Sequence, residues 1–308
     1  MNLNDKIYIA GHSGLVGSAL VRQLQDKGYN NILMRSHKEL DLINQLQVQK
    51  FFEQEKPDYV ILAAAKVGGI YANNSFPASF IYQNTMIQNN LINSSFKNNI
   101  KKFLFLGSVC IYPKFAPIPV KEESLLCGEL EPTNEAYAIA KIHGIHLLKA
   151  YNKQYGFKCV SLMPCNLYGP NDNFHPLNSH VIPALIRKFH FAGDGPVECW
   201  GDGSPSREFM YVDDLADACL FSISNFQDAE LVNIGSGENI KIKDLAESIS
   251  KITGYKGSIS WDKTKPNGTP DRPLDCSRIS SLGWRPKYTL QKGLKESYEW
   301  FKENYKHR

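Results

Sequence analysis

Two residues one helical turn apart could exchange a proton with a substrate. Tyr137 and Lys141 lie in a run of helix-forming residues that follows Pro132, Thr133 and Asn134, a typical helix start. Their spacing places a phenol and an ammonium about 6 Å apart along one helix face. Because a nearby cation favours the ionised phenol, we expect Lys141 to lower the pKa of Tyr137. Ordinary surface helices carry the same spacing, so other residues must decide.

A glycine-rich turn follows the first predicted strand, residues 6–10. Its glycines recur at every third position, and an amphipathic segment begins at residue 18. This pattern allows a tight turn and a close approach of the backbone, while free N–H groups at a helix start attract a pyrophosphate. We expect a dinucleotide site, with a plain strand-to-helix turn as the alternative. The predicted contacts are Gly11, His12, Ser13, Gly14, Leu15, Val16 and Gly17.

The residue that follows the second predicted strand, at 31–34, indicates which dinucleotide is bound. An acidic side chain at this point would bond a free ribose 2′-hydroxyl, but the chain has Arg35. An arginine can hold a 2′-phosphate through two hydrogen bonds. The sequence therefore favours NADP(H), and a solvated strand end is the alternative reading of Arg35.

Small and polar residues follow two later predicted strands, at residues 58–65 and 102–106. In an open parallel sheet, ligands collect at the carboxyl ends of the strands. Ser108 and Cys110 are therefore candidates for chemistry, although a turn serine and a core cysteine are ordinary at such positions. The small residues that would let a flat cofactor lie close are Ala63, Ala64 and Ala65.

The alternation of predicted strands and helices up to residue 163 predicts an α/β fold, a Rossmann-type doubly wound parallel sheet. We expect an NADP-binding domain of residues 1–165 plus about 211–240. Residues 166–210 and 241–308 form an interleaved, smaller substrate domain. The asparagines of the predicted helix at 79–98 are interpreted as its polar face. The other helices expected here lie at 46–52, 182–191, 242–252 and 290–301.

Composition excludes several classes of protein. The chain has 308 residues, a formal charge of +4, 43% hydrophobic and 21% charged residues, as is usual for soluble globular proteins. Its basic residues form no block, so we expect no nucleic-acid partner. The N-terminus resembles neither a signal peptide nor a membrane span, so we expect no membrane association and a cytoplasmic location. The seven cysteines contain no C-x-x-C pair, so we expect neither disulfides nor a metal site.

Two side chains beyond residue 165 suit a nucleotide ligand. Trp200 can pack on a nucleobase or sugar, and Arg207 can hold a phosphate. A core tryptophan and an exposed arginine are the alternatives.

With the glycine turn, Ser108 and the Tyr137-x-x-x-Lys141 pair, the chain resembles the extended short-chain dehydrogenase/reductases. It resembles in particular the branch that epimerises and reduces GDP-4-keto-6-deoxymannose. The resemblance spans nearly the whole chain and is most specific in residues 107–113, 130–142, 166–183 and 207–214.

The resemblance implies a GDP-linked 4-keto sugar as substrate and a homodimer built on a four-helix interface. Tyr137 would protonate the C4 alkoxide, Lys141 would hold the nicotinamide ribose, and Ser108 would bind the carbonyl oxygen. Before reduction, Cys110 as base and His180 as acid would invert C3 and C5. The further cofactor contacts implied are Leu106, Gly107, Lys141, Pro164, Asn166, Leu167 and His180. The substrate contacts implied are Asn166, Lys188, Trp200, Arg207 and Asp275.

Two departures from the family pattern keep alternatives open. The family commonly has serine where this chain has Val109, and some members have arginine where it has Ser13. A C4 reductase without epimerase activity, acting on a GDP-4-keto heptose or another deoxysugar, is therefore the second hypothesis. The third is a non-catalytic dinucleotide-binding sensor.

Overall fold

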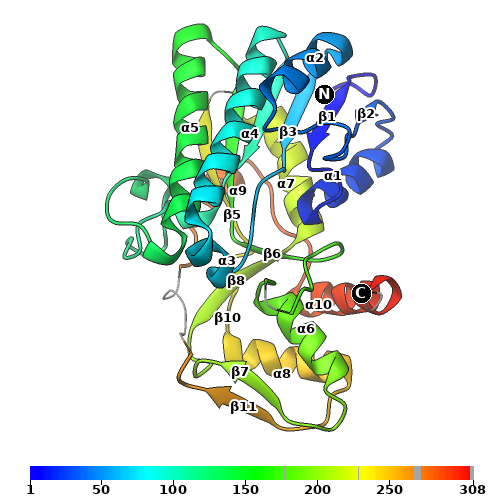
Figure 1. Ribbon diagram of the computed structural model, residues 1–308, viewed down its shortest axis with the longest axis vertical. Helices are drawn as coiled ribbons and strands as arrows, with labels where there is room; N and C mark the ends of the chain where they lie inside the picture. The colour runs from blue at the N-terminus through cyan, green and yellow to red at the C-terminus, as the bar shows by residue number, and fades with distance from the viewer. Residues whose placement is uncertain (177, 228, 266–271, 306–308) are drawn as a thin grey trace.

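A sheet of six parallel strands forms the centre of the larger part of the molecule (Figure 1). This computed structural model describes residues 1–305 apart from 177, 228 and 266–271. Every residue of β1, β4 and β5 is buried, as expected for strands covered on both faces. In sheet order the strands are β2 (Ile32–Leu33), β1 (Ile7–Ala10), β3 (Tyr59–Leu62), β4 (Lys102–Leu106), β5 (Cys159–Pro164) and β9 (Glu230–Ile234).

Helices cover both faces of this sheet, which confirms the predicted doubly wound fold (Figure 1). On one face, α1 (Leu15–Asp26) packs against α7 (Val212–Asn225). The other face carries α2 (Gln45–Glu55), α4 (Pro77–Lys97) and α5 (Glu135–Tyr155). The strand order reverses between β1 and β3, and ligands of such sheets bind in the crevice at this switch point.

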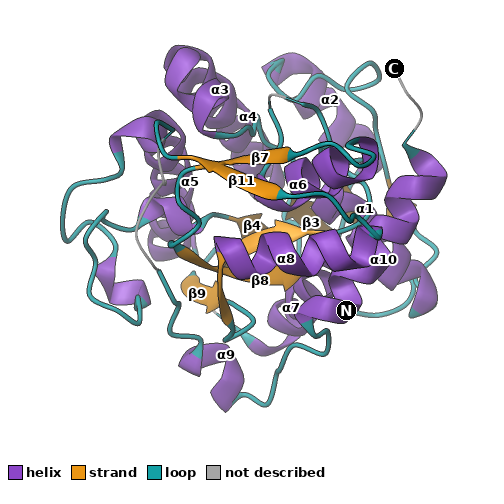
Figure 2. Cartoon of the chain, turned by 90° about the horizontal axis from the view of Figure 1, so that it is seen from below, coloured by secondary structure: helices purple, strands orange, loops and turns teal. Residues whose placement is uncertain are grey.

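The smaller part lies below the carboxyl ends of the strands (Figures 1 and 2). Its mixed sheet pairs β8 antiparallel with β10 and parallel with β6, and a parallel pair joins β7 to β11. The bounds are β6 (Asn166–Tyr168), β7 (Val197–Trp200), β8 (Ser206–Tyr211), β10 (Asn239–Lys241), β11 (Ile259–Asp262), α6 (Val181–Phe191), α8 (Ile242–Thr253) and α10 (Leu290–Asn304).

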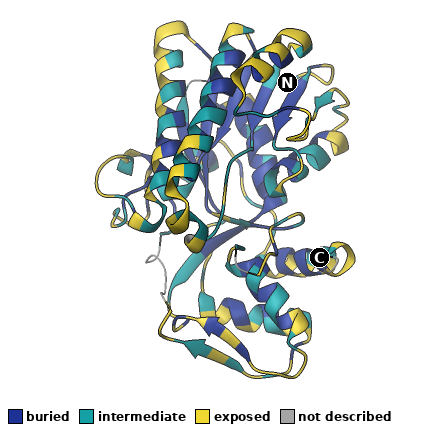
Figure 3. Cartoon of the chain, viewed as in Figure 1, coloured by how far each residue is buried: buried dark blue, intermediate teal, exposed yellow. Residues whose placement is uncertain are grey.

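Buried hydrophobic side chains form two clusters. Figure 3 shows buried residues in both parts of the molecule. Leu274, Ile279 and Trp284 pack in the larger cluster, although they fall within the substrate domain predicted for residues 241–308. The domain division stays a prediction, and these three residues argue that their segment goes with the larger part.

Several short elements complete the described chain. The helix α3 (Ile70–Ser75) is not among the helices predicted from the sequence. None of the described helices is long and apolar enough to cross a membrane. The remaining short helices are η1 (Val109–Ile111), η2 (Glu122–Ser124), η3 (Pro132–Asn134) and α9 (Ser277–Ser281).

Candidate active site

The glycine turn is packed so tightly that two of its glycines have no room for a side chain. Gly11 has φ of +86°, and a Cβ there would lie 2.7 Å from the backbone nitrogen of Ala64. A Cβ on Gly17 would overlap the carbonyl oxygen of Gly11. At Gly14, the N-cap of α1, a Cβ would meet only that same oxygen, at 3.6 Å. The turn thus draws α1 onto β1 and β3 and keeps an open face at Gly14.

A cleft lies beside this turn, where the switch point of the sheet would receive a ligand. The Nδ1 atom of His12 is buried with no hydrogen-bond partner in the described part of the chain. An unpaired buried polar atom of this kind suits a polar ligand. The residues that line the cleft are His12, Ser18, Val21, Arg22, Met34, Pro170, Asn171 and Trp300.

Arg35 lies two residues after the edge strand β2 and already has an anionic partner. One of its terminal nitrogens is 2.5 Å from a carboxylate oxygen of Glu55, and the guanidinium stacks over the ring of Phe51 at 5.5 Å. A ribose 2′-phosphate would have to share the guanidinium with Glu55. The assignment of Arg35 to the 2′-phosphate stays a prediction.

Lys141 is buried beneath the candidate site and fixes α5 to the end of β4. Its Nζ donates a hydrogen bond of 2.7 Å to the carbonyl of Leu106. It lies 4.9 Å from the ring centroid of Phe105 and 5.7 Å from that of Tyr137. The predicted pairing of phenol and ammonium on one helix face is therefore present.

The expected effect of Lys141 on the pKa of Tyr137 is wrong. Desolvation raises the pKa of Tyr137 above its usual value, and the nearby Cys110 thiol raises it further. Desolvation also lowers the pKa of Lys141 to about 7. The ammonium charge that should stabilise a phenolate is itself unfavourable at this depth, which the helical spacing could not reveal.

Ser108 and Cys110 follow β4 and lie beside the start of α5. The Oγ of Ser108 accepts a hydrogen bond of 3.3 Å from the backbone nitrogen of Cys110 and so caps η1. The thiol of Cys110 accepts one of 3.3 Å from the amide of Asn134, in η3 just before α5. Because η1 packs on α5, the structure brings Ser108, Cys110, Tyr137 and Lys141 together.

His180 lies on the smaller part of the molecule, at the start of α6. It is the N-cap residue of α6, and its side chain is accessible to solvent. Surrounding protein nevertheless lowers its pKa, as in a concave surface. Gly69 precedes α3, and a Cβ placed on it would lie 3.4 Å from the carbonyl oxygen of Ser179. The helix α3 in turn packs against η3. A short chain of contacts thus links the loop of His180 to Asn134, which holds Cys110.

Asn84 and Asn90 contradict the interpretation of the α4 asparagines as a polar face. Both are buried. The amide of Asn84 bonds both backbone groups of Lys66, at 2.8 and 3.0 Å, and that of Asn90 bonds the carbonyl of Leu42 at 2.8 Å. Asn84 falls one turn after the buried Phe80, so helical periodicity could have placed it inward. It holds the loop that leads to α3 and the candidate site.

The predicted substrate contacts lie on the smaller part and along its border. Asn166 begins β6 and donates to the Glu208 carbonyl at 2.9 Å. Pro164 ends β5, and Leu167 lies within β6. The Nζ of Lys188 donates to the Glu198 carbonyl at 2.7 Å. Trp200 is 58% exposed on β7, and Arg207 lies on β8. The role of these four residues in binding a substrate stays a prediction.

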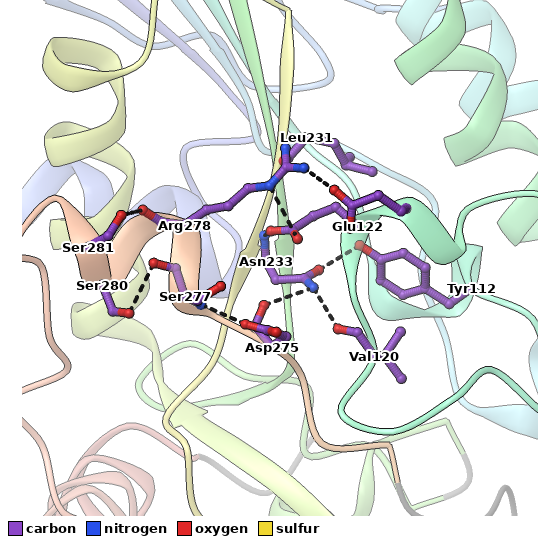
Figure 4. Close-up of polar contacts among 11 residues, drawn as sticks. Tyr112, Val120, Glu122, Leu231, Asn233, Asp275, Ser277, Arg278, Ser280 and Ser281 are labelled. Carbon is purple, nitrogen blue, oxygen red and sulfur yellow. Dashed lines mark hydrogen bonds and ion pairs between the residues drawn. The ribbon is translucent and has the colours of Figure 1, made fainter.

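Asp275 borders a polar network that is centred on the buried Asn233 and joins three segments (Figure 4). Its carboxylate accepts a hydrogen bond of 2.9 Å from the nitrogen of Ser277, and this contact lowers the pKa of Asp275. Its carbonyl accepts from the amide of Asn233, which also bonds the carbonyl of Val120. The network holds the 275–278 turn against β9, and a substrate role for Asp275 stays a prediction.

A doubly wound sheet with a glycine turn at its switch point and a Tyr-x-x-x-Lys pair at the end of β4 defines a dinucleotide-dependent oxidoreductase or epimerase. The chain belongs to the NAD dependent epimerase/dehydratase family, whose sequence model matches residues 7–235. No group of metal-ligating side chains is present among the described residues.

Named relatives match nearly the full length. The chain is 57% identical to GDP-L-fucose synthase 1 of Arabidopsis thaliana, over 97% of this chain and 94% of that one. It is 50% identical to GDP-L-fucose synthase of Escherichia coli, over 97% of each. A solved GDP-mannoheptose C4 reductase from Campylobacter jejuni with NADP bound is 42% identical, with a TM-score of 0.91 over 98% of this chain and 99% of that one.

Proposed function

We propose that this enzyme reduces the C4 ketone of a GDP-linked 4-keto-6-deoxyhexose with NADPH, after inverting C3 and C5 of the sugar. The observation that carries the proposal is the hydrogen bond by which Asn134 holds the Cys110 thiol beside Ser108 and Tyr137. A thiol held there can serve the proton transfer from carbon that epimerisation requires and reduction does not. The relatives named GDP-L-fucose synthase, at 57% and 50% identity, support the same substrate class and leave the sensor hypothesis without support.

The residues present fit a dinucleotide. The crowded Gly11 and Gly17, the open backbone at Gly14 and the unpaired Nδ1 of His12 form a cradle at the switch point. Arg35 would hold a 2′-phosphate in competition with Glu55, and the Campylobacter relative has NADP bound. NADP(H) is therefore the proposed cofactor.

In the proposed reduction, NADPH supplies the hydride when bound. Tyr137 gives its phenolic proton to the C4 oxygen as negative charge develops there. The raised pKa of Tyr137 keeps that proton in place at neutral pH until the alkoxide forms. Ser108 donates a hydrogen bond to the same oxygen.

In the proposed epimerisation, the ketone makes the protons at C3 and C5 acidic. The Cys110 thiolate takes a proton from carbon, forming S–H, while the electron pair of the C–H bond moves to the C4 oxygen. His180 returns a proton to the opposite face of the sugar. The lowered pKa of His180 makes its protonated form a stronger acid but a smaller fraction of the enzyme at neutral pH.

Variants of these two residues test the proposal. With a GDP-4-keto-6-deoxymannose substrate and NADPH, Cys110→Ser is expected to reduce the unepimerised ketone, because a serine hydroxyl is a far weaker base than a thiolate. His180→Gln is expected to permit exchange with solvent but hinder full inversion. NMR of the product reads its configuration at C3 and C5. A Cys110→Ser enzyme that still inverts both centres would refute the assignment of the base.

A C4 reductase without epimerase activity is the second candidate. Val109 stands in the catalytic loop where the family commonly has serine, and the Campylobacter relative is named a GDP-mannoheptose C4 reductase. In this case Cys110 and His180 would only line the sugar pocket. NADPH consumption across a panel of GDP-4-keto deoxyhexoses and heptoses, with exchange at C3 and C5, separates the two candidates.

We also propose a homodimer, as the family resemblance implies. The paired helices α4 and α5 carry exposed apolar side chains, among them Tyr82 and Ile139, which a four-helix interface would cover. Size-exclusion chromatography with light scattering measures the molecular mass of the protein in solution and so distinguishes a monomer from a dimer. The cytoplasmic location expected from the sequence stays a prediction.

A further inference from the structure

A segment from the C-terminal part of the chain is tied to the loop that follows Cys110. The Val120 nitrogen donates to the Pro273 carbonyl at 2.8 Å, and the Asp275 nitrogen donates to the Val120 carbonyl at 2.9 Å. Figure 4 shows Val120 and Asp275 side by side in this pairing. Arg272, directly before Pro273, is thereby anchored beside the candidate active site.

The guanidinium of Arg272 has donors without acceptors. Its Nε and one Nη atom are buried, and neither has a hydrogen-bond partner in the described part of the chain. Nearby protein lowers the pKa of Arg272, but an arginine keeps its charge at any working pH. Buried donors are almost always paired in folded proteins, so these two mark a place for an anionic group.

The groups that act on the Cys110 thiol come from three segments, around residues 108, 131–137 and 272. The amide of Asn134 donates to the thiol, and a hydrogen bond with the Ser108 side chain lowers the pKa of the thiol. The charge of Arg272 favours the thiolate, and that of the Glu131 carboxylate opposes it. Glu131 is itself paired with Lys114 at 3.1 Å, and Tyr137 is the remaining titratable neighbour.

A cation is needed at this place if Cys110 is to act as a base. Desolvation raises the pKa of the Cys110 thiol, so without help little thiolate would exist at neutral pH. Lys141 cannot supply the charge, because its Nζ is directed to the Leu106 carbonyl and its pKa is lowered to about 7. Arg272 has both the permanent charge and the uncommitted donors.

We propose that Arg272 is a positioning residue for the epimerisation step, whose guanidinium stabilises Cys110 as a thiolate. This rests on the proposed use of Cys110 as a base. The thiol gives its proton to water, the guanidinium balances the sulfur charge, and the thiolate then takes the proton from carbon. Glu131, held by Lys114, keeps the local charge low enough that Arg272 can remain beside the site.

The test is a pH profile of the reactivity of Cys110, which needs no substrate. Iodoacetamide reacts with the thiolate, and mass spectrometry of the peptide that carries Cys110 distinguishes it from the other six cysteines. In Arg272→Met the profile should move to higher pH, with alkylation at pH 7 slower by about tenfold. Arg272→Lys should restore most of the rate, since a charge is retained. Arg285→Met, which removes an exposed guanidinium elsewhere, should leave the profile unchanged.

Deuterium exchange at C3 and C5 separates this proposal from the proposed function. Exchange should fall in Arg272→Met while the rate of NADPH oxidation falls less. If the wild type shows no exchange, the epimerase function fails, but the alkylation profile still tests the effect of the Arg272 charge on the Cys110 thiol. An unchanged profile in a variant with native circular dichroism would overturn the proposal, as would a rise in KM for the GDP sugar with no shift of the profile. Arg272→Gln gives the same test if Arg272→Met does not fold.

Discussion

At the scale of single residues, burial in the candidate site disfavours the charged forms of Tyr137 and Lys141. Lys141 lies beneath the accessible Ser108, Cys110 and Tyr137, and its pKa is lowered to about 7. Desolvation penalises its ammonium form, and the only compensation among the described contacts is one hydrogen bond and two aromatic faces. A residue that costs stability is therefore kept where the proposed chemistry occurs.

Lys141→Met should make the protein more stable at neutral pH. The unfolded chain holds the lysine proton up to about pH 10.5 and the folded chain releases it near 7, so the wild type gains stability as pH rises through this range. The variant should lack that rise and gain roughly 1 to 3 kcal/mol at pH 6, less the loss of the bond to Leu106. Thermal unfolding between pH 6 and 10 measures both effects, and a wild-type stability that does not rise with pH would refute them. Turnover of Lys141→Met should fall.

Tyr137→Phe should lower turnover by about 10²- to 10⁴-fold, because only the proton-donating oxygen is removed. The T-shaped contact of the ring with Phe80 and the binding of NADPH should survive. Stopped-flow kinetics measures the rate of reduction, and a fluorescence titration measures the binding of NADPH. Near-normal reduction by the variant would exclude Tyr137 as the proton donor.

NADPH should be preferred over NADH, and Arg35→Ala should reduce that preference. Because Arg35 forms an ion pair with Glu55, a substitution of Glu55 is the matched control for Arg35→Ala. Glu55→Gln should strengthen NADPH binding because the 2′-phosphate would no longer compete with a carboxylate. The ratio of kcat/KM for the two cofactors checks both changes, and equal ratios in wild type and Arg35→Ala would show that another residue holds the phosphate.

At the scale of elements, the glycine turn could be predicted because its pattern and its contacts are local. Gly11 and Gly17 are each three positions from Gly14, and a Cβ on either would meet backbone, that of Ala64 after β3 for Gly11 and that of Gly11 itself for Gly17. The α8 helix was expected at 242–252 and ends at Thr253 before Gly254, whose φ is +74°. By contrast, the six residues of α3 are too few to carry a period.

Gly17→Ala and Gly14→Ala should separate stability from cofactor binding. The first would force a methyl group into the Gly11 carbonyl and should cost about 3 kcal/mol or more. The second has an ordinary extended backbone and a 3.6 Å contact, so stability should change by less than about 1 kcal/mol while NADPH binding weakens. Chemical unfolding measures the stability of each variant, and a titration measures its binding of NADPH. A stable Gly17→Ala protein would contradict the packing described here.

At the scale of the whole molecule, what the sequence could not provide is the set of contacts between distant segments. Arg272 and Cys110 are far apart in the chain, and only the pairing of Val120 with Pro273 and Asp275 brings them close. Asn84 is buried because the loop at Lys66 needs both of its hydrogen bonds. The pKa of Tyr137 depends on solvent exclusion by several segments, which no local spacing encodes.

The central claim is that one site both epimerises and reduces a GDP-linked 4-keto sugar. The most direct measurement is the wild-type reaction with GDP-4-keto-6-deoxymannose and NADPH in D₂O, with NMR of the sugar product. Inversion through Cys110 and His180 predicts deuterium at both C3 and C5 and the inverted configuration at each carbon. A reduced product with protium at C3 and C5 and both configurations retained would contradict the claim and leave a C4 reductase.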